Sequence, residues 1–484
     1  MHRAALEQTA RLHPEELDFE ERTALLMVAA LARVELAALE QHFERFAVLS
    51  HMGGPGTLLA TLGSLQRADT AERLEHYVAR LNAVPEYLSS AATVATEAAR
   101  SGQVPARAVI DRTIAQVERL LAGAVSENPA LSAVPADDGT ARSKVAATIE
   151  RVVLPAYGRF RDVVLDVRPH APEALGLCAL AGGDELYRAR IFAWTSLDLD
   201  PSEVHSFGCE DVAAIEVERA ELGAGIERRE GEPKSRAEIL ALANGLVERG
   251  WEACHEHFGR LPKENCEVRA VDPSRERDVL DYYIPPTADG SRPGVYYVNT
   301  GPGRDVRHLA STVFHEANPG HHLQMSLEQE AADRPAIRRF GNELVAGAFV
   351  EGWALYGERL ADEIGLFTND YDRLGMLELQ ALRAVRLVVD TGIHAFGWDR
   401  ERALREMRKT GLTENEIAIE VDRYAGLPAQ ALSYRIGQRS IERLRKRAQA
   451  RDGTAFSLKA FHDRLLALGS LPLDTLETEV ERSS

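Results

Sequence analysis

Apolar side chains recur three and four residues apart along most of the chain, which is the spacing of helices with one face in a core. The pattern is plain from about residue 18 to 125 and returns after residue 143. One early run contains Leu25, Leu26, Val28, Leu31 and Val34. The pattern predicts a mainly α protein.

The division of the chain into sections follows from a polar stretch at 126–142. Its small and polar residues, with Pro129, Pro135 and Gly139, predict a surface loop. We therefore expect an N-terminal helical section at 1–125 and a second helical section at 143–484, joined as one continuous two-lobed body.

A period of two replaces the helical period near residue 264. Short strands are predicted at 266–271, 281–284 and 295–298, with a turn at 288–294 between the last two. We expect a small antiparallel sheet near 264–300, with 295–298 as an edge strand, directly before a helix.

The composition excludes several classes of protein. With 75 acidic and 57 basic residues the formal net charge is −18, which repels polyanions and argues against nucleic acid or an anionic membrane as a partner. The N-terminus lacks the continuous apolar stretch of a secretory signal, and the four cysteines have no CxxC spacing. We expect a cytoplasmic protein with reduced thiols, and the oligomeric state stays open.

One short segment concentrates groups that bind metals: His315, Glu316, His321 and His322. In the familiar HExxH motif the histidines are four residues apart on one helix face and share a zinc ion. His315 and His321 are six apart, so a straight helix would point them to different sides. Pro319 has no N–H for the carbonyl of His315 and must open the helix. The opened turn allows His321 to come back to the same side as His315. His322 would need a larger distortion, and the choice between the two stays open.

A third ligand is expected from a separate helix, and Glu351 lies in the apolar stretch 344–355. A buried carboxylate is costly unless it binds a cation or strong hydrogen-bond donors. Glu343 or Glu358 would replace it if another face of that helix points inward. Two imidazoles and one carboxylate suit a single zinc ion, for which manganese or cobalt can substitute.

Two further expectations follow from the position of this segment. Glu316 comes directly after its ligand histidine, so its carboxylate points to the open side of the metal and can take a proton from water. The strand at 295–298 precedes the metal helix, so an extended substrate can add to it, with Tyr297 among the substrate-binding residues.

The longer pattern resembles a bacterial family known as domain of unknown function 885, from about residue 20 to 450. The resemblance is carried by four motifs: His315-Glu316-x-x-Pro319-Gly320-His321, Glu351-Gly352-Trp353-Ala354, Asp390-Thr-Gly-Ile-His394 and Pro428-x-Gln430-Ala431-Leu-Ser-Tyr434. The family looks like a distant relative of helical zinc peptidases, and this implies a metallohydrolase fold with His315, His321 and Glu351 as ligands. By similarity to those peptidases Tyr434 stabilises the oxyanion, with Tyr424 as the alternative.

Four more residues are candidates for substrate binding. Arg386 and Arg435 are suited to a two-pronged contact with a substrate carboxylate, which would make the protein a carboxypeptidase or dipeptidase. His322 and His394 are the others, although each is equally suited to a purely structural role.

The leading hypothesis is therefore a zinc-dependent hydrolase of peptide or amide bonds. A second hypothesis keeps the metal but replaces the peptide with a small molecule of secondary metabolism. A third is a helical binding protein whose metal site is not catalytic, although such a site would not require Glu316.

Overall fold

The computed structural model describes residues 1–223, 234–273, 276, 280–287, 290, 292–301 and 306–482, without the side chain of Glu343. The described chain is mainly helical and has one small sheet, as the pattern predicts. None of its helices is both long and apolar enough to cross a bilayer.

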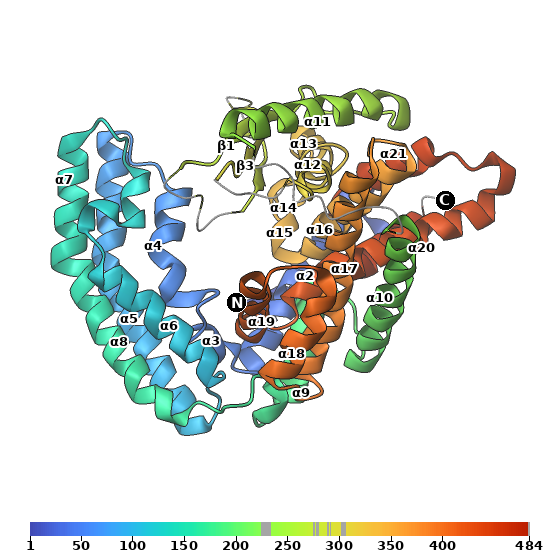
Figure 1. Cartoon of the computed structure of the whole chain (residues 1–484). Helices are drawn as coiled ribbons and strands as arrows, with labels where there is room; N and C mark the ends of the chain where they lie inside the picture. The colour runs from blue at the N-terminus through green and yellow to red at the C-terminus, as the bar shows by residue number, and fades with distance from the viewer. Residues whose placement is uncertain are drawn as a thin grey trace.

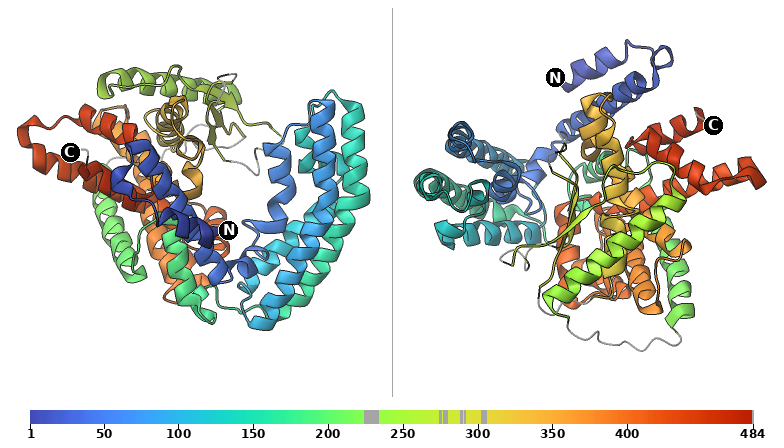
Figure 2. Two further views of the ribbon diagram at one scale, coloured as in Figure 1. Left: turned by 180° about the vertical axis from the view of Figure 1, so that it is seen from behind. Right: turned by 90° about the horizontal axis from the view of Figure 1, so that it is seen from above.

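The first group of helices forms a bundle that stands beside the rest of the molecule (Figure 1, blue to teal) and is separate in the reverse view as well (Figure 2). It contains α4 (Gly54–Leu65), α5 (Ala71–Ser101), α6 (Arg107–Ala122), α7 (Gly139–Thr148) and α8 (Leu154–Val167), and α3 (Phe43–Ala47) leads into it. One hydrophobic core runs through it from Leu49 to Ala171.

This core crosses the boundary expected at 126–142. The segment contains a short 3-10 helix, η3 (Pro129–Ala133), in which Ala130 and Leu131 are buried against the bundle. The helices before and after it therefore share one core, and the surface loop expected there is partly an interior element. Polar composition alone concealed this, because only a few apolar side chains of the segment are buried.

The remaining helices share several further hydrophobic clusters, and the largest of them joins a helix near the start of the chain to one near its end. These helices are α1 (His2–Thr9), α2 (Phe19–Glu40), α9 (Gly183–Thr195), α10 (Pro201–Gly223), α11 (Arg236–His257), α12 (Leu309–Glu316), α13 (His321–Glu330), α14 (Ala336–Phe340), α15 (Asn342–Val345), α16 (Gly347–Glu363), α17 (Asp370–His394), α18 (Arg400–Met407), α19 (Glu414–Gly426), α20 (Ser433–Asp452), α21 (Leu458–Leu468) and α22 (Leu473–Arg482). Met27 of α2 packs in the same cluster as Val480 of α22.

Capping residues define the starts of two helices near the site. Ser235 precedes α11 and Thr413 precedes α19, and each accepts a hydrogen bond from the backbone of a glutamate three residues later. Glu238 and Glu416 bond back to the capping residue, which completes a capping box in each case.

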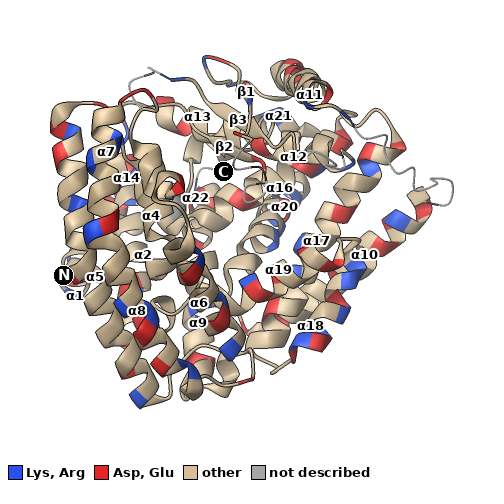
Figure 3. Ribbon diagram, turned by 60° about the vertical axis from the view of Figure 1, so that its left-hand side comes forward, with Lys and Arg blue, Asp and Glu red and all other residues tan. Residues whose placement is uncertain are grey.

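Charged residues of both signs are spread along the helices of the molecule (Figure 3). Acidic and basic side chains are interspersed along α5, α8 and α18 (Figure 3). The excess of acidic residues is thus spread over many helices.

The sheet consists of β1 (Glu267–Ala270), β2 (Tyr282–Ile284) and β3 (Val295–Val298), in the order β1-β3-β2. β2 is antiparallel to β3, but β1 is parallel to it. The predicted antiparallel sheet is therefore wrong for β1, and β3 is the central strand where an edge strand was expected. After β1 the chain forms β2 two places away in the sheet, and β3 then fills the place between them.

Candidate metal centre

A break between α12 and α13 brings the two histidines together. α12 ends at Glu316, and α13 begins at His321. A Cβ on Gly320 would lie 1.9 Å from the carbonyl oxygen of His315, so only glycine fits this turn. Trp353 donates its indole N–H to the carbonyl of Pro319 at 2.9 Å and fixes the loop onto α16. The interruption predicted at Pro319 is confirmed, although the helix divides in two instead of opening by one turn.

The imidazoles of His315 and His321 face the same carboxylate oxygen. Nε2 of His315 lies 3.5 Å from Oε2 of Glu351, and Nε2 of His321 lies 3.6 Å from it. Ligand atoms of a four-coordinate zinc, each about 2.0 to 2.2 Å from the ion, stand roughly 3.3 to 3.6 Å apart. The chemistry and spacing of these three groups therefore fit one ion between them.

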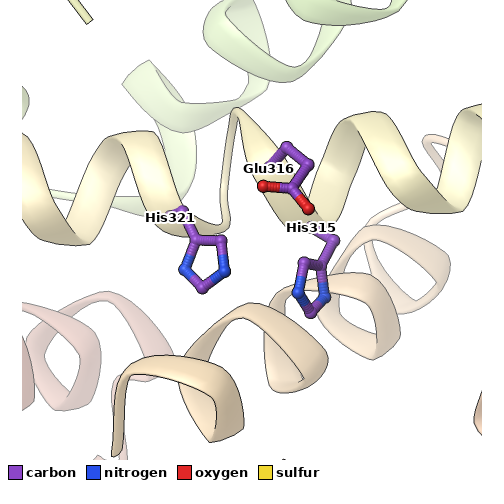
Figure 4. A group of neighbouring side chains, drawn as sticks. All are labelled: His315, Glu316 and His321. Atoms are coloured by element: carbon purple, nitrogen blue, oxygen red, sulfur yellow. The ribbon is translucent and has the colours of Figure 1, made fainter. Parts of the chain in front are cut away.

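Glu316 lies beside this ligand set. Its carboxylate and the two ring nitrogens lie within 4.8 Å of one another. Figure 4 shows the rings of His315 and His321 pointing to the same side, with Glu316 between the two helix ends. The side chain of Glu316 therefore lies close to the position that an ion between the two imidazoles would occupy.

A buried carboxylate behind His315 completes the centre. Nδ1 of His315 donates to Glu358 at 2.7 Å, and Ser311 donates to the other oxygen of Glu358 at 2.6 Å. This bond leaves Nε2 of His315 with a lone pair for the metal. Glu358, considered above as an alternative ligand, thus orients a ligand. Glu351 and Glu358 share a face of α16 because they are seven residues apart, and this spacing was the signal in the sequence.

The site is electrostatically arranged for a cation. Burial lowers the pKa of His315, but Glu351 and Glu358 raise it more, to about 10. Burial also raises the pKa of Glu316, although His321 and His315 oppose the shift. Arg383 stands 3.9 Å from Glu358 and balances part of its charge, whereas Glu351 and Glu316 face the two imidazoles, where a divalent cation would balance their charge.

His322 lies on the other side of α13, against the sheet. Its Nδ1 is 2.9 Å from the hydroxyl of Tyr283, and its Nε2 is 3.0 Å from the carbonyl oxygen of Glu264. Burial lowers its pKa to about 4. Both ring nitrogens of His322 are therefore engaged, and the side chain joins α13 to β2. It is His321 that lies next to His315 and Glu351.

The helices that carry Tyr434 and Glu351, α20 and α16, cross at two glycines. A Cβ on Gly352 would lie 2.5 Å from Cα of Gly437, so the backbones are in contact. Tyr434 is one turn before this crossing, and Glu351 is one residue before it. Burial raises the pKa of the Tyr434 hydroxyl, and the charge of Glu351 adds to the shift. The hydroxyl of Tyr424, in contrast, donates to Glu420.

The two arginines proposed for a substrate carboxylate lie in different surroundings. The guanidinium of Arg386 stands 4.9 Å from the ring centroid of Tyr434, next to the centre. Arg435 is buried and donates to Asp211 at 2.8 Å and to Gln438 at 2.6 Å. Arg435 therefore belongs to an internal ion pair between α10 and α20.

His394 and Tyr297 also lie apart from the ligand set. His394 accepts the backbone N–H of Leu177 at 3.2 Å and contacts the carbonyl oxygen of Tyr424 at 3.0 Å, so both its nitrogens are engaged. Tyr297 stacks on Tyr282 with ring centroids 4.8 Å apart. Because its neighbour Tyr296 packs toward α12, Tyr297 lies on the opposite face of the sheet.

Comparisons with known proteins show the fold but name no activity. The profile of a family described as "Bacterial protein of unknown function (DUF885)" matches residues 1–480. A crystal structure described as a "putative lipoprotein" from Colwellia psychrerythraea is 26% identical, with a TM-score of 0.87, over 99% of this chain and 90% of that one. A second, from Shewanella oneidensis and described as of unknown function, is 17% identical with a TM-score of 0.77, over the same shares. No curated protein matches the chain.

Proposed function

The chain belongs to the bacterial family DUF885, and we propose that it is a metal-dependent hydrolase of peptide or amide bonds. The observation that carries the proposal is the convergence of His315 and His321 on one oxygen of Glu351, at 3.5 and 3.6 Å. Two imidazoles and one carboxylate are a donor set of catalytic zinc sites, in which the fourth position is left open for water or substrate.

Each residue of the centre then has a distinct part in hydrolysis. His315, His321 and Glu351 would hold the ion, which would supply Lewis acidity to the carbonyl and lower the pKa of water. Glu316 takes the proton from the attacking water and delivers it to the leaving amine. The hydroxyl of Tyr434 donates a hydrogen bond to the oxyanion that develops on the carbonyl oxygen.

An extended substrate would align along β2, because β3 is enclosed by the other two strands. β2 pairs with β3 on one side, and on the other side no strand of the described chain lies against it. A peptide that pairs with this edge by backbone hydrogen bonds would run past α13, to which β2 is joined through Tyr283 and His322.

The proposal is tested by separating metal binding from catalysis. Glu316→Gln should keep one zinc per chain and lose nearly all cleavage of a peptide library, because the amide accepts no proton from water. Glu256→Gln, at an exposed glutamate of α11, is the matched control and should be as active as the wild type. Full metal-dependent activity in Glu316→Gln would refute the role of the base. No cleavage by the zinc-loaded wild type would refute the hydrolase.

A further inference from the structure

A second cluster of charged residues lies beside Tyr434, on α17 and α19. Arg386 donates from Nε to Oε2 of Glu420 at 3.1 Å, and its Nη2 is 3.0 Å from the same oxygen. Arg423 donates to the other oxygen of Glu420 at 3.3 Å. Burial raises the pKa of Glu420, but the two arginines lower it more, to about 2. Two permanent cations therefore share one carboxylate, and the cluster carries an excess positive charge.

This cluster adjoins the metal centre through Tyr434. The guanidinium of Arg386 lies over the Tyr434 ring, and the charge of Glu351 acts on the same tyrosine. The charges of both Arg386 and Arg423 also act on its hydroxyl. The positively charged Arg386 and Arg423 thus lie on the side of the candidate metal centre on which Tyr434 stands.

Both arginines keep donors for a further partner. Glu420 holds Nε and Nη2 of Arg386, and Nη1 has no hydrogen-bond partner among the described residues. Arg423 uses Nη1 for Glu420 and Nη2 for Gln430, at 2.6 Å, while 23% of its side chain is exposed. Their contacts hold the two guanidiniums in fixed positions, which lowers the cost of ordering them around a ligand.

We propose that Arg386 and Arg423 bind the C-terminal carboxylate of a peptide substrate, so that the protein cleaves next to the C-terminus of its substrates. Arg386 was expected in this role from the sequence, but its partner is Arg423, since Arg435 is paired inside the protein with Asp211. Guanidinium groups bind carboxylates by short charge-assisted hydrogen bonds. A carboxylate anchored here would place the adjoining peptide bonds on the Tyr434 side of the metal centre. The inference rests on the proposed hydrolase.

The test compares two N-acetylated peptide libraries that differ only at the C-terminus, one with a free carboxylate and one amidated. The zinc-loaded wild type should release C-terminal residues from the first library about ten- to hundredfold faster, which is the usual contribution of hydrogen bonds to a charged group. Mass spectrometry of the products gives both the rate and the position of cleavage.

Variants assign this preference to the cluster. Arg423→Gln should bring the two libraries to within a few-fold of each other through a rise in KM, and Arg423→Lys should restore part of the preference. The double variant Arg386→Gln with Glu420→Gln removes both members of the buried ion pair, and the charge that loses its carboxylate is that of Arg423, whose side chain is 23% exposed. It should reduce the preference as well. Arg405→Gln, at an exposed arginine of α18, is the control and should preserve it.

Each outcome decides one of the two proposals. Equal cleavage of both libraries by the wild type, or cleavage at internal bonds only, would overturn the C-terminal anchor and leave the hydrolase intact. An unchanged preference in both Arg423→Gln and the double variant would overturn the assignment to these arginines. Absence of cleavage in both libraries would overturn the hydrolase itself, and the anchor with it.

Discussion

A single hydrogen bond decides which nitrogen of His315 faces the metal position. Its Nδ1 is bonded to Glu358, which is fully buried and is also held by Ser311. An imidazole with one nitrogen fixed in this way presents the other to an ion in a defined direction, and a neighbouring carboxylate raises its basicity. If His315 is a metal ligand, as we propose, metal affinity should therefore depend on a residue that does not touch the ion.

We expect Glu358→Gln to weaken zinc binding by about ten- to hundredfold, because the amide cannot hold His315 as strongly. Competition with a chromophoric chelator measures the dissociation constant. Glu363→Gln is the matched control, since Glu363 lies on the same helix but is 47% exposed and pairs with Arg445. Equal affinity in the wild type and Glu358→Gln would show that this contact has no part in metal binding.

The two candidate tyrosines can be distinguished at the same scale. Tyr434→Phe should lower kcat by about a hundred- to thousandfold, the usual effect of removing one oxyanion donor, with zinc content unchanged. Tyr424→Phe should have a much smaller effect on kcat, because its hydroxyl is bonded to Glu420. Steady-state kinetics of both variants would decide, and the reverse order of effects would assign the oxyanion to Tyr424.

At the scale of elements, the crossing of α16 and α20 determines how close Tyr434 comes to Glu351. A Cβ on Gly437 would lie 1.8 Å from the carbonyl oxygen of Ala348, and one on Gly352 would meet the backbone of Gly437. Glycine at both positions allows the two helices to touch. Tyr434 and Glu351 are neighbours for this reason.

We expect Gly437→Ala to destabilise the protein by about 1 to 3 kcal/mol, since the helices must separate to admit the methyl group. Its kcat should also fall, because Tyr434 moves away from Glu351. Gly347→Ala lies on α16 with nothing within 4 Å of the added Cβ, and it should be neutral or slightly stabilising. Urea unfolding compares the two variants, and equal stability would contradict the close crossing.

Patterns local in the sequence predicted the helices, the three short strands and the interruption near Pro319. The order of the strands was not predictable in this way, because it depends on the path of the chain between them. Arg423 was missed for a similar reason, since only the packing of α19 on α17 brings it to Arg386. His322 and His321 are adjacent in the sequence, and only the divided helix shows which of them turns to Glu351.

For the whole molecule, buried histidines predict sensitivity to acid. Burial lowers the pKa of His394 to about 4 and that of His462 to about 3. Both are neutral in the folded protein, while an unfolded histidine titrates near 6.5. Between these values the unfolded chain binds more protons, so stability is complete above pH 6.5 and is lost as the pH falls toward 4.

We expect protonation of His394 in the unfolded chain to reduce, by itself, the free energy of unfolding by about 2 kcal/mol between pH 7 and pH 5. Denaturant titrations at each pH measure this free energy. They are made in EDTA, so that loss of metal at low pH does not contribute to the change. His394→Asn should have a lower stability at pH 7 but a shallower dependence on pH, whereas His255→Asn, at an exposed histidine, should follow the wild type. An equally steep dependence in His394→Asn would contradict this origin of the acid sensitivity.

The location of the protein and its partners stay predictions at this scale. The net charge of −18 argues against binding to nucleic acid or to anionic membranes. The cytoplasmic location also stays a prediction.

The metal content of the purified protein tests the central claim most directly. Elemental analysis should find one zinc per chain in the wild type and none in His315→Ala, His321→Ala or Glu351→Ala. His322→Gln should keep the metal, because that side chain faces the sheet. A folded wild type that binds no zinc even when zinc is supplied, or a His322→Gln variant that loses it while His321→Ala retains it, would contradict the account.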